Sequence, residues 1–218
     1  MKQHAEIYAL EGFNPVPLNG DKSPVSAMAG TNYLYEPVEV DGRFDGCAKI
    51  GITCGVCSRG MEVIDFDCHD GEDIQSVFNE FMTDETVIML ATTGRLAIYQ
   101  TPSGGFHVIY LAGRYFGKSE VLARWQSGKV MIETRGAGSY AVVAPSAGYN
   151  FMAGVEIVKL EDIDRDTRAH LFTLAKSFNR VEVKQVQGAG SGKWGEWDES
   201  KPWGKFNSEG VSEAKALL

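Results

Sequence analysis

The sequence predicts an α+β fold with a mixed or antiparallel sheet. Six stretches are rich in β-branched and aromatic residues and are bounded by Gly, Ser, Pro or Asp, which is the pattern of strands. At least two other stretches carry apolar residues at three- and four-residue spacing, which is the pattern of amphipathic helices. Because a helix separates early strands from several later ones, both kinds of element are expected to share one domain.

The elements are expected in the following order along the chain. A short helix covers residues 3–10 and ends at Gly12, and the prolines and glycines of residues 12–25 predict extended chain and turns. Apolar, β-branched stretches predict strands at residues 48–53, 61–67, 87–92, 106–111, 130–135 and 139–144. Apolar residues at helical spacing predict helices at residues 72–82 and 164–178.

Composition and charge restrict the classes of function. The 218 residues are 44% hydrophobic, which is enough to bury a sizeable core. No apolar run approaches the roughly 20 residues that cross a bilayer, and the N-terminal residues lack the apolar stretch of a signal peptide, so we expect a cytoplasmic protein without a membrane partner. The net charge of −8 argues against a protein that coats duplex DNA, although it leaves room for a local basic groove.

The four cysteines fall in one short segment, and His69 follows the last of them. A Cys-x-x-Cys pair can hold a structural zinc ion when a second pair lies downstream. That second pair is missing, so we favour the alternative that these cysteines are small apolar residues, and zinc is the less favoured reading. The residues concerned are Cys47, Cys54, Cys57 and Cys68.

The composition changes after residue 180. We expect residues 1–180 to form one domain and residues 181–218 to form a Gly- and Ser-rich linker followed by the start of a helical segment. The run GAGSGK at residues 188–193 is no phosphate-binding Walker loop, because Gln187 stands where glycine is needed and Trp194 where Ser or Thr is needed.

Two aspartates stand two positions apart at the end of the predicted strand 61–67. Side chains at positions i and i+2 of a strand share a face, so Asp65 and Asp67 are expected on one face while Ile64 and Phe66 pack on the other. Two adjacent carboxylates near a core are costly unless one is protonated or a cation lies between them. Mg²⁺ or Mn²⁺ would fit these ligands, and the alternative is that both aspartates only cap the following turn and helix.

Two further stretches carry candidate ligands. Residues 101–110, TPSGGFHVIY, enter a strand through Ser103, Gly104 and Gly105, where missing side chains allow backbone amides to approach an anion, and His107 follows. Residues 130–146, VMIETRGAGSYAVVAPS, place Glu133 in an apolar strand with Arg135 on the same face. Taken alone, the first is an ordinary turn and the second a sheet-surface ion pair.

In this order, the stretches resemble the bifunctional DNA primase/polymerase family, the prim-pol branch of the archaeo-eukaryotic primases. The resemblance covers most of residues 7–150. Its motifs are GFNPVPLNGDKSP, GVCSRGMEVIDFD, TPSGGFHVIY and IETRGAGSYAVVAPS, and the tail KPWGKFNSEGVSEAKALL resembles the linker that joins this domain to a helicase in phage and plasmid members. The chain departs from the family pattern in the extra Arg59 before Gly60, in lacking a helicase and in its cysteine cluster.

The resemblance implies an archaeo-eukaryotic primase fold, in which an N-terminal α/β unit merges with an RRM-like sheet around an active-site cleft. It implies template-directed addition of NTPs or dNTPs as a DNA primase, a DNA polymerase or both, on single-stranded DNA, in the replication of a phage or mobile element and together with a helicase. It assigns the metal-binding and catalytic role to Asp65, Asp67 and Glu133 with two Mg²⁺ or Mn²⁺ ions. It assigns nucleotide binding to Ser103, Gly104, Gly105, His107, Arg135 and Lys22.

Two other classes of function stay open at this stage. A metal-dependent nuclease or phosphohydrolase would also use clustered carboxylates and a histidine, and a non-catalytic single-strand DNA-binding initiator module would keep the fold without the chemistry. Residues 114–129 add four cations beside Tyr115, Phe116 and Trp125, so this stretch is either a base-stacking surface or an ordinary solvent-facing helix or loop. The cations are Arg114, Lys118, Arg124 and Lys129.

Overall fold

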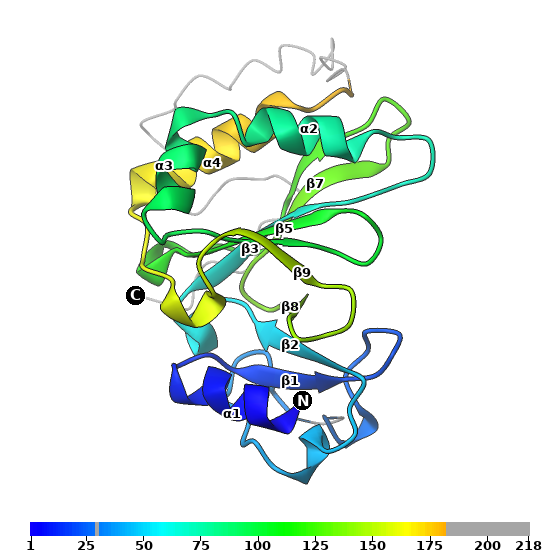
Figure 1. The fold of residues 1–218 in the computed structure, drawn as a ribbon, viewed down its shortest axis with the longest axis vertical. Coiled ribbons are helices and arrows are strands. Elements are labelled where there is room, and N and C mark those ends of the chain that lie inside the picture. The colour runs from blue at the N-terminus through cyan, green and yellow to red at the C-terminus, as the bar shows by residue number, and fades with distance from the viewer. Residues whose placement is uncertain (29–30, 182–218) are drawn as a thin grey trace, which may run out of the picture. The chain divides into compact units, whose positions relative to one another are not determined.

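The structure is a computed structural model of the chain, and it describes residues 1–28 and 31–181. Helices and two antiparallel sheets share this region (Figure 1), which confirms the predicted α+β class. The helices are α1 (Lys2–Leu10), α2 (Ile74–Phe81), α3 (Glu85–Thr92) and α4 (Arg165–Ser177). The strands are β1 (Pro15–Leu18), β2 (Lys49–Thr53), β3 (Met61–Phe66), β4 (Ala97–Gln100), β5 (Phe106–Leu111), β6 (Val121–Arg124), β7 (Val130–Arg135), β8 (Tyr140–Val143) and β9 (Asn150–Gly154).

The larger sheet has six strands in the order β6-β7-β3-β5-β4-β9, and every neighbouring pair is antiparallel. Of the two predicted arrangements, a mixed or an antiparallel sheet, the mixed one is therefore wrong for this sheet. β3 lies near its centre, between β7 and β5, so that Asp65 is directly opposite Glu133 on one side and His107 on the other. The register alone thus brings three predicted site residues together.

The smaller sheet has the order β1-β2-β8 and is also antiparallel. β8 comes from the motif that follows β7 in sequence, yet it pairs with β2 of the N-terminal region. A cluster of apolar side chains from β2, β3, β5, β8 and α1 fills the space between the two sheets, with Ile52, Val63 and Ile109 among them. The larger sheet is therefore buried on this face by the smaller one.

Helices α2, α3 and α4 cover the opposite face of the larger sheet (Figure 1). Phe66 and Phe106 point into this layer, where the rings of Phe78 and Phe106 stack with centroids 3.9 Å apart. Side chains alternate along β3, so Ile64 and Phe66 face the helices while Val63 and Asp65 face the smaller sheet. This confirms the prediction that Asp65 lies on one face of the strand and that Ile64 and Phe66 pack on the other.

The prediction of a strand at residues 87–92 is wrong, because these residues form helix α3. Its N-cap is Asp84, whose carboxylate accepts hydrogen bonds from the backbone amides of Thr86 (2.9 Å) and Val87 (3.1 Å). Val87 and Leu90 are buried, and Ile88 is half-exposed. A short apolar run is compatible with either a strand or a helix, and here the N-cap at Asp84 favours the helix.

Strands β1, β4, β6 and β9 were missed from the sequence. β1 lies in the Pro-rich segment that we expected to be only extended chain, and β6 lies within residues 114–129. In that stretch Trp125 is 1% exposed and packs in the core, so it offers no surface on which a base could stack. Phe116 packs partly against the same core, whereas the four cations of the stretch are exposed.

Residues 1–181 form one compact unit. The linker and helical segment expected at residues 181–218 lie outside the described residues, apart from Val181. Within residues 1–28 and 31–181, no helix is both long and apolar enough to cross a membrane.

Candidate active site

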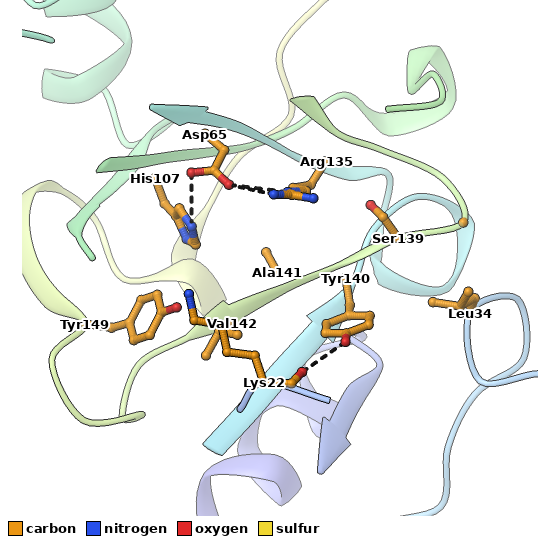
Figure 2. Close-up of a pocket in the computed structure, with 11 residues that line it drawn as sticks. Lys22, Leu34, Asp65, His107, Arg135, Ser139, Tyr140, Ala141, Val142 and Tyr149 are labelled. Carbon is orange, nitrogen blue, oxygen red and sulfur yellow. Dashed lines mark hydrogen bonds and ion pairs between the residues drawn. The ribbon is translucent and has the colours of Figure 1, made fainter. Parts of the chain in front are cut away.

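A cavity of about 380 Å³ lies between the two sheets (Figure 2). Strands β3, β5 and β7 contribute one wall, and β8 with the residues just before it contributes the other. The lining residues are Lys22, Leu34, Asp65, His107, Arg135, Gly138, Ser139, Tyr140, Ala141, Val142 and Tyr149. Of the nine predicted site residues, Lys22, Asp65, His107 and Arg135 line this cavity.

Three carboxylates gather at one edge of the cavity. Asp65 on β3 and Glu133 on β7 are direct cross-strand partners, and Asp67 follows the end of β3. One carboxylate oxygen from each of the three lies within 4.8 Å of the others. Hard carboxylate oxygens at this separation are suitable ligands for a divalent cation such as Mg²⁺ or Mn²⁺. The predicted triad is therefore assembled in space.

Arg135 balances part of this negative charge. Its Nη2 lies 3.2 Å from Asp65 Oδ2 and 2.5 Å from Glu133 Oε1, and its Nε donates a second hydrogen bond to Asp65 Oδ2 at 3.3 Å. Partial burial of the guanidinium acts to lower the pKa of Arg135, but Asp65 and Glu133 outweigh it and raise this pKa. One guanidinium can balance only one of the three carboxylate charges, so additional positive charge would stabilise the site.

Asp67 forms no ion pair with Arg135. Burial raises the pKa of Asp67 to about 6, and the negative charges of Asp65 and Glu133 add to this effect. A carboxyl group with this pKa is ionised at neutral pH only at a free-energy cost, which a bound cation would remove. The electrostatics of the triad therefore fit a metal site.

His107 is buried next to the triad. Its Nε2 lies 3.5 Å from Asp65 Oδ1, which is long for a hydrogen bond, and its Nδ1 has no hydrogen-bond partner within the described residues. Burial lowers the pKa of His107, although Asp65 acts in the opposite direction. The ring is therefore neutral at neutral pH, and one of its buried nitrogens has no hydrogen bond to compensate its burial.

Lys22 reaches the cavity from a tight turn of the N-terminal region. Its backbone adopts a positive φ of 72°, and its carbonyl accepts a hydrogen bond of 3.0 Å from the Tyr140 hydroxyl. The turn is fixed by hydrogen bonds from the amide and hydroxyl of Ser23 to the Asp21 carboxylate. Figure 2 shows the Lys22 side chain extending into the cavity toward Tyr149.

The turn Ser103–Gly105 lies beside the site but does not line the cavity. It packs on the end of β3 so closely that a Cβ atom on Gly105 would lie 2.2 Å from the Phe66 carbonyl oxygen. The Gly104 amide donates to the Thr101 carbonyl at 3.0 Å, and the Ser103 hydroxyl lies 3.1 Å from that of Thr101. Glycine at 105 is thus required by the close approach of two backbones.

Tyr140 and Tyr149 are cavity residues that the sequence did not reveal. Tyr149 lies with its ring centroid 5.5 Å from that of His107, although the two residues are far apart in sequence. Burial raises the pKa of Tyr149 to about 12. Tyr140 lies within the motif at residues 132–146 but was assigned no role there, and no local pattern marks Tyr149. The place of both in the cavity depends on how the small sheet packs over the large one.

The four cysteines are free thiols. Within residues 1–28 and 31–181, they form no cluster of three or more metal-binding side chains, whereas the carboxylate triad does. Cys54 is packed in the core between the sheets, where burial raises the pKa of its thiol to about 12. The described structure therefore gives a zinc site at these cysteines no support.

The model of the family described as Prim-Pol, bifunctional DNA primase/polymerase, N-terminal, matches residues 5–163. The chain belongs to this family. The match confirms the resemblance seen in the sequence, and it spans all residues of the cavity and the carboxylate triad. No curated protein matches the chain.

Membership of the prim-pol family gives the site its chemical context. At the level of the family, the activity is nucleotidyl transfer by a DNA primase or polymerase, and the substrates are DNA and nucleotides. The three carboxylates form the only group of three or more potential metal ligands that the described part of the chain contains. A metal-dependent reaction of this family therefore has one candidate location in residues 1–28 and 31–181.

Proposed function

We propose that this prim-pol domain catalyses template-directed addition of nucleotides to DNA, as a primase, a polymerase or both. The observation that carries the proposal is the carboxylate triad at the edge of a cavity that also presents Lys22, Arg135 and a buried histidine with an unpartnered nitrogen. A triphosphate needs cations and hydrogen-bond donors, and the reacting atoms need metal ligands, so the two sets of groups complement each other.

Asp65, Asp67 and Glu133 would hold two divalent metal ions, Mg²⁺ or Mn²⁺. Such ions lower the pKa of an attacking 3′-hydroxyl and stabilise the charge of the leaving pyrophosphate. Lys22 and Arg135 would neutralise phosphate oxygens. Arg135 would exchange some of its present contacts with Asp65 and Glu133 for the nucleotide as the carboxylates turn to the ions.

His107 would donate a hydrogen bond to the triphosphate from a ring nitrogen that bears a proton. A bound triphosphate places negative charge beside the ring and so raises the pKa that burial lowers, which favours this donation. Ser103, Gly104 and Gly105 would support the outer phosphates from beside the cavity, with the Ser103 hydroxyl turning from its contact with Thr101.

We further infer that the smaller sheet with α1 corresponds to the N-terminal α/β unit of the primase fold, and the larger sheet with α2 to α4 to its RRM-like half. The position of the cavity between the sheets supports this assignment. Action in a phage or mobile element together with a helicase is proposed on the sequence resemblance alone, because residues 201–218 lie outside the described residues.

The test is nucleotide incorporation on a single-stranded template with Mg²⁺ or Mn²⁺, with and without a primer, while pyrophosphate release is monitored. Asp65→Asn, Asp67→Asn and Glu133→Gln should each lower the rate by more than about 100-fold, because each removes a ligand of ions worth several kcal/mol. The exposed Asp70→Asn variant removes the same charge nearby and should keep the wild-type rate. Products without a primer would identify a primase.

Folded wild-type protein that binds nucleotide but forms no product with either metal would contradict the proposal. Shortening of the template without pyrophosphate release from added nucleotides would instead identify a nuclease. DNA binding without either reaction would leave a non-catalytic initiator module as the function.

A further inference from the structure

A second and larger cleft adjoins the cavity. It has a volume of about 870 Å³, within the range of about 300–1,000 Å³ that is usual for ligand-binding clefts. Its walls come from α1, the end of β4, the loop between β8 and β9, and the segment after β9. Tyr149 lines both this cleft and the cavity that contains Asp65, so the two adjoin at this side chain.

Three tyrosines and one phenylalanine line the cleft. Tyr8, Tyr99 and Tyr149 are nearly buried in its walls, whereas Phe151 is 51% exposed at the rim. The rings of Tyr99 and Phe151, which are cross-strand partners of β4 and β9, meet edge to face with centroids 5.6 Å apart. Phe151 thus offers an open aromatic face that is held in place by a buried neighbour.

The loop between β8 and β9 is held rigidly beside the proposed phosphate site. Ser146 is buried and its hydroxyl donates to the Ile50 carbonyl and accepts from the Ile50 amide, at 3.1 and 2.9 Å. The Tyr8 hydroxyl donates to the Ala144 carbonyl at 2.8 Å. Gly148 packs against Pro102, the residue before Ser103, and a Cβ atom at Gly148 would lie 2.8 Å from the Pro102 ring. The cleft is therefore preformed and not created by a ligand.

The lining of the cleft is better suited to the bases of a nucleic acid than to its phosphates. Among the described residues that line it there is no lysine or arginine, and Glu156 is already paired with Lys159 at 2.9 Å. Phosphates would therefore find no lysine or arginine in the lining, whereas flat uncharged bases stack well on aromatic rings. An acidic peptide would lack a cationic partner here for the same reason.

We propose that this cleft binds nucleobases of single-stranded DNA, the strand that the domain copies, with Phe151 as a stacking platform and the phosphates directed to solvent. The inference rests on the proposed function, since it takes the strand to be the substrate of the neighbouring site. It adds to that function the place where the strand enters the domain.

The experiment measures binding of fluorescent oligo(dT), and of an abasic oligonucleotide of the same length, to the full chain in EDTA without nucleotide. Phe151→Ala should weaken oligo(dT) binding about tenfold, because it removes the aromatic ring on which a base stacks. The loss should be the same at low and moderate salt, because no phosphate contact is removed. Binding of the abasic oligonucleotide should not change.

Met152→Ala is the matched control. Met152 is the next residue of β9 and is 47% exposed, yet it does not line the cleft. Its replacement should leave the affinity for both oligonucleotides unchanged, and Phe151→Trp should restore strong binding. Thermal melting of each variant verifies that it is folded.

Equal affinity of the wild type and Phe151→Ala for oligo(dT) would overturn the inference, and the cleft would then be left for an apolar peptide or another partner. An equal loss of affinity for both oligonucleotides would also overturn it, because bases would not be the ligand. Since no metal or nucleotide is present, these outcomes are independent of catalysis. Base-dependent binding by a protein that makes no product would contradict only the proposed function.

Discussion

Arg135 contacts Asp65 and Glu133 but not Asp67, so the three carboxylates of the triad have different electrostatic surroundings. Asp65 and Glu133 have a guanidinium beside them, so their charges are partly balanced without a metal ion. Asp67 lies partly buried beside two negative groups, which accounts for its raised pKa of about 6. Its ionised form therefore destabilises the metal-free fold, a common feature of functional sites.

We predict that Asp67→Asn stabilises the metal-free protein. The folded pKa of Asp67, about 6, exceeds the ordinary value of 3.8, so this carboxyl favours the fold at low pH and the advantage is lost as pH rises through about 6. The melting temperature of Asp67→Asn in EDTA should therefore exceed that of the wild type, and by more at about pH 8 than at about pH 5.

The control for this prediction is the exposed Asp70→Asn, which should not change the melting temperature at either pH. Saturating Mg²⁺ or Mn²⁺ should raise the melting temperature of the wild type and have little effect on Asp67→Asn. A lower melting temperature of Asp67→Asn than of the wild type in EDTA at both pH values would contradict the prediction. It would show that the Asp67 carboxylate stabilises the metal-free fold.

At the scale of elements, strand β3 carries a charged network on the face opposite Asp65. Glu62 is fully buried and accepts hydrogen bonds from Arg168 of α4 (2.6 and 2.9 Å), from the Tyr110 hydroxyl (2.8 Å) and from the Gly117 amide (2.6 Å). This network joins α4 to the centre of the larger sheet. Burial, together with the neighbouring charge of Glu62, raises the pKa of Tyr110 far above its ordinary value.

We predict that Arg168→Met lowers the free energy of unfolding by about 3 kcal/mol, because it leaves the buried Glu62 carboxylate without its cation. The matched control is Lys176→Met on the same helix. Lys176 pairs with Glu120 at 3.2 Å, but both side chains are about half-exposed, so its loss should cost less than about 1 kcal/mol.

Urea unfolding of both variants measures this difference. Equal stabilities of the Arg168→Met and Lys176→Met variants would contradict the argument.

Most elements could be predicted from local sequence, and the failures have local causes. Strands β5 and β7 agree with the predicted limits to the residue, and α1, α2, α4, β2, β3 and β8 agree to within two residues at each end. Helix α3 was predicted as a strand because its apolar run was read without the cap at Asp84. β6 and β9 are the edge strands of the larger sheet and contain exposed and polar residues, so they lack the continuous apolar pattern of the predicted strands.

At the scale of the whole molecule, the three hydrophobic core clusters, the carboxylate triad, the cavity and the cleft lie in the compact unit of residues 1–181. We predict that a chain ending at Val181 keeps the melting temperature, the cooperative unfolding and the nucleotide affinity of the full chain. Calorimetry and nucleotide titration of the two chains measure this. A shorter chain that unfolds without a cooperative transition would show that residues 182–218 belong to the folded domain.

The sequence by itself determined the fold class, the prim-pol family and the three carboxylates. These follow from short-range properties: alternation places Asp65 and Asp67 on one face, and the ordered motifs identify the family. Glu133 was found for the same reason, since an acidic residue in an apolar strand is visible in the sequence.

Only the tertiary structure decided how the site is completed. The register of β3 with β5 and β7 brings His107 and Glu133 to Asp65, and the packing of the smaller sheet over the larger one brings Lys22 and Tyr149 to the cavity. The tertiary structure also places the Ser103–Gly105 turn beside the cavity and buries Trp125 in the core on the helix-covered face of the larger sheet. These positions depend on contacts between residues distant in sequence, and a local pattern carries no information about which distant surface will cover it.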